Sequence, residues 1–191
     1  MTIPPPHTSA PPPSPRVVWD ADQIGRAITR MAHQILESCG GADELILLGI
    51  PTRGVLLAQR LSAAMRAAEG AEVAVGELDI TMYRDDLRHQ PTRAVGRTLI
   101  PRPIDDQIVV LVDDVLHSGR TIASAIDALR DLGRPRIVQL AVLVDRGQRQ
   151  LPIQPDHVGR FLPTSQGEWI NLRMAEIDGF DAATIVTTGE V

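Results

Sequence analysis

The stretch Val109-Val-Leu-Val-Asp-Asp-Val-Leu-His-Ser-Gly-Arg-Thr121 places two adjacent carboxylates and a turn of small residues between an apolar run and a helical pattern. Residues 108–112 predict a short buried parallel strand, and residues 122–132 predict the helix that follows. Asp113 and Asp114 would then lie at the carboxyl end of the strand, where open α/β sheets bind ligands. The stretch therefore predicts an α/β fold with a ligand site at this edge of its sheet.

The turn after the strand suits a phosphate group. Backbone N–H groups at the start of a helix lack intrahelical partners, and the helix dipole favours an anion there. Ser118 and Thr121 add hydroxyl donors, and Gly119 lets the backbone come close. The two carboxylates would repel a phosphate, so they suit sugar hydroxyls or a metal instead. Asp-Asp before a helix is by itself an ordinary solvated turn, but the whole stretch favours a ribose 5-phosphate site.

Composition limits the class of protein. The chain has 191 residues with 43% hydrophobic and 23% charged residues, which suits one globular domain over residues 16–191. It shows no apolar run of membrane-spanning length and no secretion signal, and its single cysteine, Cys39, suits a reducing cytoplasm. The net charge of −5 argues against strong non-specific binding of nucleic acid, although all 19 basic residues are arginine, whose planar fork suits phosphate.

The pattern along the chain alternates strands and helices. Residues 1–15 contain seven prolines and predict an extended or disordered tail. Asp20 and Gln23 form a capping-box pattern that opens a helix, and Gly40-Gly41 ends it. This alternation predicts a doubly wound, mainly parallel sheet. The other expected elements are strands at 44–50, 73–83, 108–112, 136–144, 157–160, 169–174 and 183–187, a helix at 54–68 and a long loop at 84–107.

A second anion site is expected where the strand at 44–50 turns into the next helix. Thr52, Arg53 and the N–H of Gly54 could hold an anion, although alone they are equally well read as an ordinary turn. The loop at 84–107 could close over the site and exclude water, with Arg84 or Arg93 meeting the anion.

The stretch at 109–121 resembles the phosphoribosyl pyrophosphate (PRPP) signature of type I phosphoribosyltransferases. Residues 78–87, 143–153, 156–159 and 163–165 further resemble the bacterial PyrR family of pyrimidine operon attenuators, over roughly residues 17–185. The resemblance implies a type I phosphoribosyltransferase fold with a small hood and a long flexible loop. It also implies uracil phosphoribosyltransferase activity with Mg²⁺ and PRPP, giving UMP and pyrophosphate. The resemblance further implies that the protein binds pyrimidine-operon mRNA under control of UMP or UTP. It also implies that the protein is cytoplasmic and forms a homodimer or higher homo-oligomer.

The resemblance also implies roles for single residues. Asp113 and Asp114 would bind the ribose hydroxyls, with Asp113 as a candidate ligand of the Mg²⁺ that PRPP carries. Arg53 and Arg84 would act on the pyrophosphate. The remaining substrate contacts would come from the phosphate turn and the base pocket: Val115, Leu116, His117, Ser118, Gly119, Arg120, Thr121, Arg146 and Val158. The chain departs from the family at Pro51, where lysine is usual, and at His117-Ser118, where Phe-Thr is usual.

The first helix carries a candidate RNA surface. Arg26, Thr29, Arg30 and His33 fall opposite its apolar stripe. Such residues on an exposed face are usually just solvated, but Thr29, Arg30 and His33 match the positions that bind RNA in the resembling family, and Arg149 is expected to extend this surface. Two other functions stay open: salvage of a purine or another nucleobase without RNA binding, and RNA regulation without catalysis.

Overall fold

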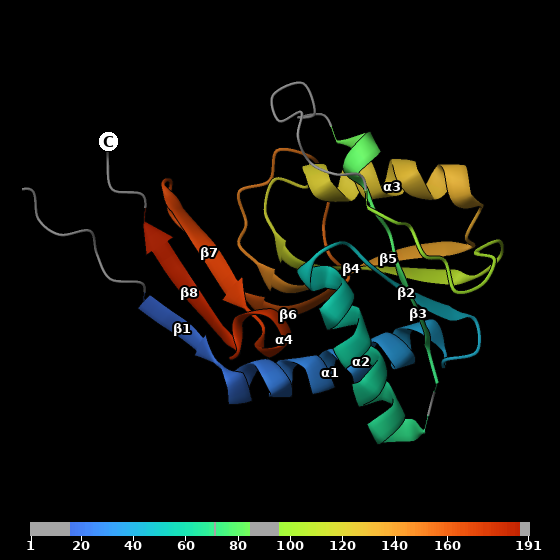
Figure 1. Cartoon of the computed structure of the whole chain (residues 1–191), viewed down its shortest axis with the longest axis horizontal. Helices are drawn as coiled ribbons and strands as arrows, with labels where there is room; N and C mark the ends of the chain where they lie inside the picture. Colours follow the sequence, from blue (N-terminus) through green and yellow to red (C-terminus); the bar gives the residue numbers. More distant parts are fainter. Residues whose placement is uncertain (1–15, 71, 85–95, 188–191) are drawn as a thin grey trace, which may run out of the picture.

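The computed structural model describes residues 16–70, 72–84 and 96–187. A five-stranded sheet forms the centre of the molecule, and all of its neighbouring strands run parallel (Figure 1). The sequence-based prediction of a mainly parallel, doubly wound sheet is therefore confirmed. In spatial order the strands are β3 (Ala74–Glu77), β2 (Leu45–Gly49), β4 (Ile108–Leu116), β5 (Ile137–Asp145) and β6 (His157–Phe161).

Helices cover both faces of this sheet. The helices α1 (Ala21–Cys39) and α2 (Arg53–Glu69) pack on one face, and α3 (Arg120–Leu132) packs on the other (Figure 1). Alternate residues of the central strands point to the two faces, so Val110 and Val112 join the core under α1 and α2 while Val109 and Leu111 join the core under α3. Central strands buried on both faces explain the unbroken apolar runs in the sequence.

A second sheet forms a small hood at one end of the molecule (Figure 1). It consists of three antiparallel strands in the order β1 (Arg16–Asp20), β8 (Ala182–Thr187) and β7 (Glu168–Arg173). The short helix α4 (Ala175–Asp178) joins β7 to β8. We did not predict β1 or α4 from the sequence.

The ends of α1 follow the predicted signals. The N–H of Gln23 donates to Asp20 Oδ1 at 2.8 Å, and the N–H of Asp20 donates to Gln23 Oε1 at 3.2 Å, which completes the capping box. Gly40 ends the helix with a φ of 73°, a left-handed conformation that glycine adopts without steric cost.

Two expected boundaries are wrong. The strand expected at 73–83 ends at Glu77 and gives way to a 3₁₀ helix, η1 (Thr81–Tyr83), because Asp79 Oδ1 accepts from both the N–H and the hydroxyl of Thr81 and bends the chain. The motif strand, expected to end at residue 112, continues to Leu116. Of the loop expected at 84–107, residues 85–95 lie outside the described residues, as does the tail at 1–15, and Leu99 pairs with Glu77 in an antiparallel bridge.

Across the described residues, the helices all fall short of the length and apolarity needed to cross a bilayer.

Candidate active site

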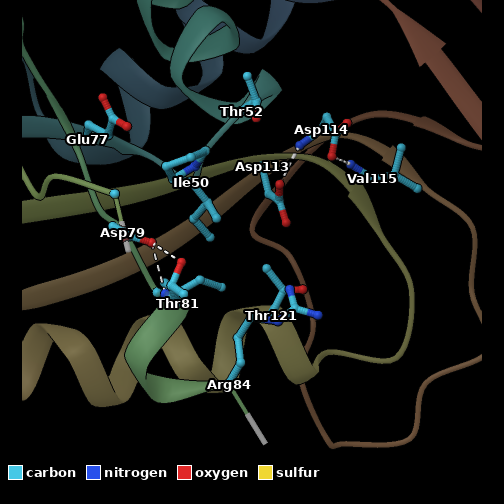
Figure 2. A pocket seen from close by; sticks show the side chains of 13 residues that line it. Ile50, Thr52, Glu77, Asp79, Thr81, Arg84, Asp113, Asp114, Val115 and Thr121 are labelled. Carbon is cyan, nitrogen blue, oxygen red and sulfur yellow. Dashed lines mark hydrogen bonds between the residues drawn. The ribbon is translucent and has the colours of Figure 1, made fainter. Parts of the chain in front are cut away.

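A pocket of about 360 Å³ opens at the carboxyl ends of β2, β3 and β4 (Figure 2). This is the edge at which the sequence predicted a ligand site. Two backbone hydrogen bonds hold its walls together: Ile50 N–H donates to the Val112 carbonyl at 2.9 Å, and Leu78 N–H donates to the Gly49 carbonyl at 3.0 Å. The pocket is lined by Ile50, Pro51, Thr52, Glu77, Asp79, Ile80, Thr81, Arg84, Gly96, Asp113, Asp114, Val115 and Thr121.

Asp113 and Asp114 both line this pocket, as expected (Figure 2). Asp113 Oδ1 accepts from the Asp114 N–H at 2.9 Å, and Asp114 Oδ1 accepts from the Val115 N–H at 2.8 Å. Asp113 is buried, and that burial, reinforced by the negative charge of Asp114, raises its pKa well above the ordinary value. A cation or hydroxyl donors brought into the pocket would favour the charged form of Asp113.

The oxygen-rich lining fits a magnesium ion that arrives with its substrate. Glu77, Asp79, Asp113 and Asp114 all line one pocket, and carboxylate oxygen is a ligand that Mg²⁺ prefers. However, nowhere in the described parts of the chain do three acidic, histidine or cysteine side chains converge closely enough to hold a metal. This arrangement suits a metal held largely by the oxygens of a phosphorylated ligand.

The turn from β4 to α3 is fastened to the segment that follows β5. The N–H groups of Gln150 and Leu151 both donate to the Ser118 carbonyl at 3.0 Å, and the N–H of Arg146 donates to the Leu116 carbonyl at 3.0 Å. Arg120 Nε also donates to Gln150 Oε1 at 3.0 Å. Gly119 has a φ of 91° at the start of α3, where a Cβ would lie 3.3 Å from the side chain of Ile153. The turn is therefore held from outside, and Thr121 reaches the pocket from the first turn of α3.

Arg149, expected to extend the RNA surface, takes part in this fastening. Its guanidinium donates to the carbonyls of Ile153 at 2.8 Å, His117 at 3.0 Å and Gly147 at 3.3 Å, and pairs with Asp145 at 2.7 Å. Only 20% of its side chain is exposed. Arg149 is thus directed inward, between the phosphate turn and the end of β5.

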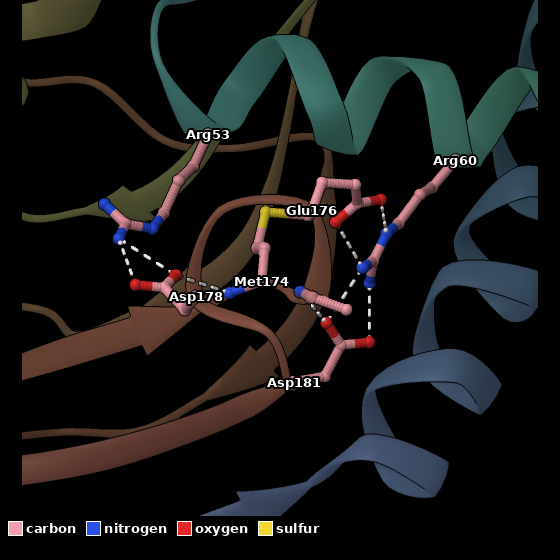
Figure 3. A network of polar contacts seen from close by, with 7 residues as sticks. Arg53, Arg60, Met174, Glu176, Asp178 and Asp181 are labelled. Carbon is pink, nitrogen blue, oxygen red and sulfur yellow. Dashed lines mark hydrogen bonds and ion pairs between the residues drawn. The ribbon is translucent and has the colours of Figure 1, made fainter.

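Arg53 also lies away from its expected place. Thr52 lines the pocket, but the Arg53 guanidinium is directed to the hood, where Nη2 contacts Asp178 Oδ2 at 3.1 Å (Figure 3). Gly54 packs so closely on β4 that a Cβ there would lie 2.4 Å from the Val112 carbonyl oxygen. Arg84 lines the pocket as expected, whereas Arg93 lies outside the described residues.

Arg146 and Val158 lie beyond this pocket, on the segments after β5 and in β6. Arg146 Nη2 donates to the Glu168 carbonyl at 2.8 Å, and burial lowers the pKa of its guanidinium. The Val158 side chain packs against the core under α3.

Glu77 and Asp79 are pocket residues that the sequence reasoning missed. Glu77 is the last residue of β3, the strand next to β2, and Asp79 follows two residues later. Reading residues 73–83 as one continuous strand hid the strand end, and the Asp79-Ile-Thr81 turn pattern was the signal that could have revealed it.

The exposed face of α1 carries the other predicted residues. Thr29, Arg30 and His33 are all exposed. Arg30 Nη2 donates to the carbonyl of Gly159 and, at 3.4 Å, to that of Val158, both in β6, and His33 Nδ1 lies 3.9 Å from Glu69 Oε1. The three side chains form one polar stripe next to the edge strand of the sheet.

Comparisons with known proteins agree with this architecture. Residues 19–171 match the phosphoribosyl transferase domain family. Among solved structures, a hypoxanthine-guanine phosphoribosyltransferase from Bacillus anthracis has a TM-score of 0.70 at 17% identity, covering 90% of this chain and 98% of that one. The hypoxanthine phosphoribosyltransferase of Trypanosoma cruzi has a TM-score of 0.69 at 16% identity, covering 91% and 97%. These structures share the fold.

Several relatives are far more similar in sequence, and each is named bifunctional protein PyrR. The one from Leifsonia xyli is 57% identical over 91% of this chain and 98% of its own length. Those from Streptomyces coelicolor and Mycobacterium tuberculosis are 57% and 52% identical, each over 89% of this chain. The chain therefore belongs to the phosphoribosyl transferase domain family and, within it, to the PyrR family.

Proposed function

We propose that the protein transfers ribose 5-phosphate from PRPP to uracil, giving UMP and pyrophosphate, and that uridine nucleotides in the same pocket control its binding to pyrimidine-operon mRNA. The observation that carries the catalytic proposal is the pocket itself. Paired carboxylates from the end of β4 and a hydroxyl from the first turn of α3 face one cavity, which matches a ligand with hydroxyls at one end and phosphate at the other.

In the proposed reaction, a bond forms between N1 of uracil and C1 of the ribose while the bond from C1 to the pyrophosphate oxygen breaks, and the proton of N1 is released to the pyrophosphate or to water. As in glycoside chemistry, positive charge develops on the sugar ring and negative charge on the leaving group. Asp113 and Asp114 would orient the ribose through its hydroxyls and meet the positive charge on the ring. When bound with PRPP, Mg²⁺ would supply charge neutralisation at the pyrophosphate.

The leaving pyrophosphate would be received at the wall formed by Thr52 and Arg84. Arg84 would approach from the end of η1, and Thr52 from the turn before α2. The 5-phosphate would lie at the turn from Leu116 to Thr121, whose outer carbonyls are already occupied by the segment after β5. The uracil ring would lie towards the backbone near Arg146 and Val158.

A substitution in the carboxylate pair tests the catalytic proposal. Asp114→Asn should lower kcat/KM for UMP formation by about a hundredfold or more, since it removes a charge from the ribose site. Asp127→Asn is the matched control, because this carboxylate lies exposed on α3, where it pairs with Arg130. Near-normal UMP formation by Asp114→Asn would rule out the ribose role. Activity with hypoxanthine or guanine instead of uracil would favour nucleobase salvage.

The polar stripe on α1 supports the regulatory half of the proposal. Exposed arginine, histidine and threonine side chains suit phosphates and unstacked bases of single-stranded RNA. UMP should strengthen binding of a pyrimidine-operon leader RNA in a filter-binding or fluorescence assay, and Arg30→Ala should abolish that binding while retaining UMP formation. If the wild-type protein forms UMP but does not bind this RNA, the regulatory half of the proposal is ruled out and the protein is an enzyme only. The proposal also includes a cytoplasmic location. It further includes a homodimer or higher homo-oligomer, whose molar mass light scattering can measure.

A further inference from the structure

Two arginines of α2 hold the hood helix α4 and the turn after it (Figure 3). Arg53 Nη2 lies 3.2 and 3.1 Å from the two carboxylate oxygens of Asp178. Arg60 donates to both oxygens of Asp181 at 2.7 and 2.8 Å and to both oxygens of Glu176 at 2.8 and 2.6 Å. Arg53 and Arg60 are seven residues apart, so they lie about two turns apart on the same side of α2.

The two aspartates are chemically matched. Asp178 accepts a hydrogen bond from the Met174 N–H at 2.8 Å, and Asp181 accepts one from the Ala175 N–H at 2.7 Å. Their side chains are 20% and 17% exposed. Each carboxylate is therefore fixed by a backbone N–H of the hood and presents its charge to one arginine of α2.

The two arginines differ in what lies beside them. Arg53 stands between Thr52, which lines the pocket, and Gly54, whose Cα is pressed against β4 beside Asp113. Arg60 lies about 10 Å further along the helix axis, in the body of α2. We call residues 50–54 the pyrophosphate loop. A contact that fixes Arg53 therefore constrains the backbone of this loop. A contact that fixes Arg60 constrains only the later turns of α2.

The arginines also differ in how fully they are engaged. Arg60 uses Nε, Nη1 and Nη2 in its hydrogen bonds to the hood. The hydrogen bonds from Arg53 to Asp178 both come from Nη2, and Arg53 Nε is buried without a hydrogen-bond partner among the described residues. Arg53 is therefore held to the hood through a single nitrogen, whereas Arg60 is held through three.

We propose that Asp178 is a positioning residue for the pyrophosphate end of PRPP. Its carboxylate accepts both hydrogen bonds from Arg53 Nη2. The contact keeps the pyrophosphate loop in the conformation that receives the anion. Asp181 holds the hood to α2 without acting on the loop. The identity of the anion rests on the proposed function; the mechanical link between Asp178 and the loop does not.

The test compares Asp178→Asn with Asp181→Asn, which is the same substitution on a matched carboxylate. The measurements are the dissociation constant of inorganic pyrophosphate with Mg²⁺ by calorimetry, KM for PRPP and for uracil, kcat, and Tm. Asp178→Asn should weaken pyrophosphate binding and raise KM for PRPP by about five- to tenfold, the size of one lost charged contact, while KM for uracil stays within about twofold. Asp181→Asn should lower Tm and leave both PRPP and pyrophosphate binding within about twofold.

Other results overturn the proposal. Equal effects of the two substitutions on pyrophosphate binding would reduce Asp178 to a structural contact of the hood. Tighter pyrophosphate binding by Asp178→Asn would mean that the carboxylate competes with the anion for Arg53. If Asp178→Asn does not fold, Asp178→Glu retains the charge and should bind pyrophosphate between wild type and the Arg53→Gln variant. Pyrophosphate binding needs no turnover, so a wild-type protein that makes no UMP would refute the proposed function and leave this test intact.

Discussion

At the scale of single residues, the missing side chain of Gly54 determines how closely α2 can approach the carboxylate pair. A Cβ at this position would lie 2.4 Å from the Val112 carbonyl oxygen and 3.3 Å from Asp113 Cα, and both are backbone atoms of β4. Neither atom can move without shifting the strand that carries Asp113 and Asp114. Residues 50–54 and the carboxylates of Asp113 and Asp114 are thus held at a fixed separation by a backbone contact.

We therefore expect Gly54→Ala to disturb both stability and the site. The free energy of unfolding should fall by about 1–3 kcal/mol through overpacking, and KM for PRPP should rise. Gly25→Ala is the control, because Gly25 lies in α1 with open space where a Cβ would be placed, and the substitution should stabilise the protein by up to about 1 kcal/mol. Denaturant unfolding and steady-state kinetics measure both effects, and similar behaviour of the two variants would contradict the close contact.

His117 should make nucleotide binding sensitive to pH. Burial and the positive charge of Arg146 lower its pKa, so it is neutral in the free protein at pH 7. A phosphate bound at this turn would favour the protonated imidazole and raise that pKa, so binding of the phosphate should take up a proton. Calorimetry of UMP binding in buffers of different ionisation enthalpy measures this uptake. It should be smaller in His117→Gln, and equal uptake by both proteins would show that His117 does not sense the phosphate.

At the scale of elements, local signals predicted the buried strands of the central sheet and two strands of the hood, β7 and β8, but not β1 or α4. The apolar runs, the capping box at Asp20 and the Gly40 stop predicted α1 and the buried strands, because each signal lies within the element that it forms. The strand β1 forms by pairing with β8, whose residues lie at the other end of the chain, and no local pattern in Arg16–Asp20 records that partner. The four-residue helix α4 is too short for helical periodicity.

The site residues also divide into those positioned by local sequence and those positioned by distant partners. Asp113, Asp114 and Thr121 could be predicted because they lie in one continuous stretch at the end of a strand. The place of Arg53 could not, because its partner Asp178 is 125 residues away in the hood. The inward direction of Arg149 could not be predicted for a related reason: three of its four acceptors are backbone carbonyls, which no sequence pattern identifies.

The attachment of the hood to α2 should weaken in acid. The hydrogen bonds from Arg60 lower the pKa of Asp181 and of Glu176, so both carboxylates contribute stability above their ordinary pKa values. As pH falls through the lowered values, the carboxylates take up protons and that stability is lost.

Arg60→Gln tests this dependence. At pH 7 it should lower the free energy of unfolding by about 1–3 kcal/mol, a range between exposed and buried ion pairs because these side chains are only partly buried. The difference from wild type should shrink as pH falls from about 5 to about 3, where the carboxylates become protonated. Urea unfolding at several pH values measures it, and a difference independent of pH would mean that Arg60 acts through packing alone.

At the scale of the whole molecule, one edge of the sheet connects the polar stripe of α1 to the nucleotide site. Arg30 on α1 donates to the carbonyls of Val158 and Gly159 in β6. The strand β6 pairs with β5, whose end leads into the segment that fastens the phosphate turn. A ligand that shifts this segment can therefore act on Arg30 through the paired strands β5 and β6, which is the route by which we expect bound UMP to affect RNA binding.

The charge balance of the molecule limits how RNA can bind. A protein with a net charge of −5 attracts RNA only where positive side chains gather, and we expect the charges on α1 to supply phosphate contacts. For single-stranded RNA, each neutralised phosphate contributes about −0.7 to the slope of log K against log salt concentration. Arg30→Gln should therefore make that slope less steep by about 0.7 and weaken binding at every salt concentration.

The control for this measurement is Arg130→Gln, an arginine on α3 whose side chain is 75% exposed and which lies on the opposite face of the sheet. It carries the same charge change, so it should alter the net charge of the molecule without altering the slope. Equal slopes for Arg30→Gln and Arg130→Gln would mean that RNA binds elsewhere than on α1. A reduced slope for Arg30→Gln that is unaffected by UMP would separate the two functions, because Arg30 would then contact the phosphate without transmitting the state of the nucleotide site.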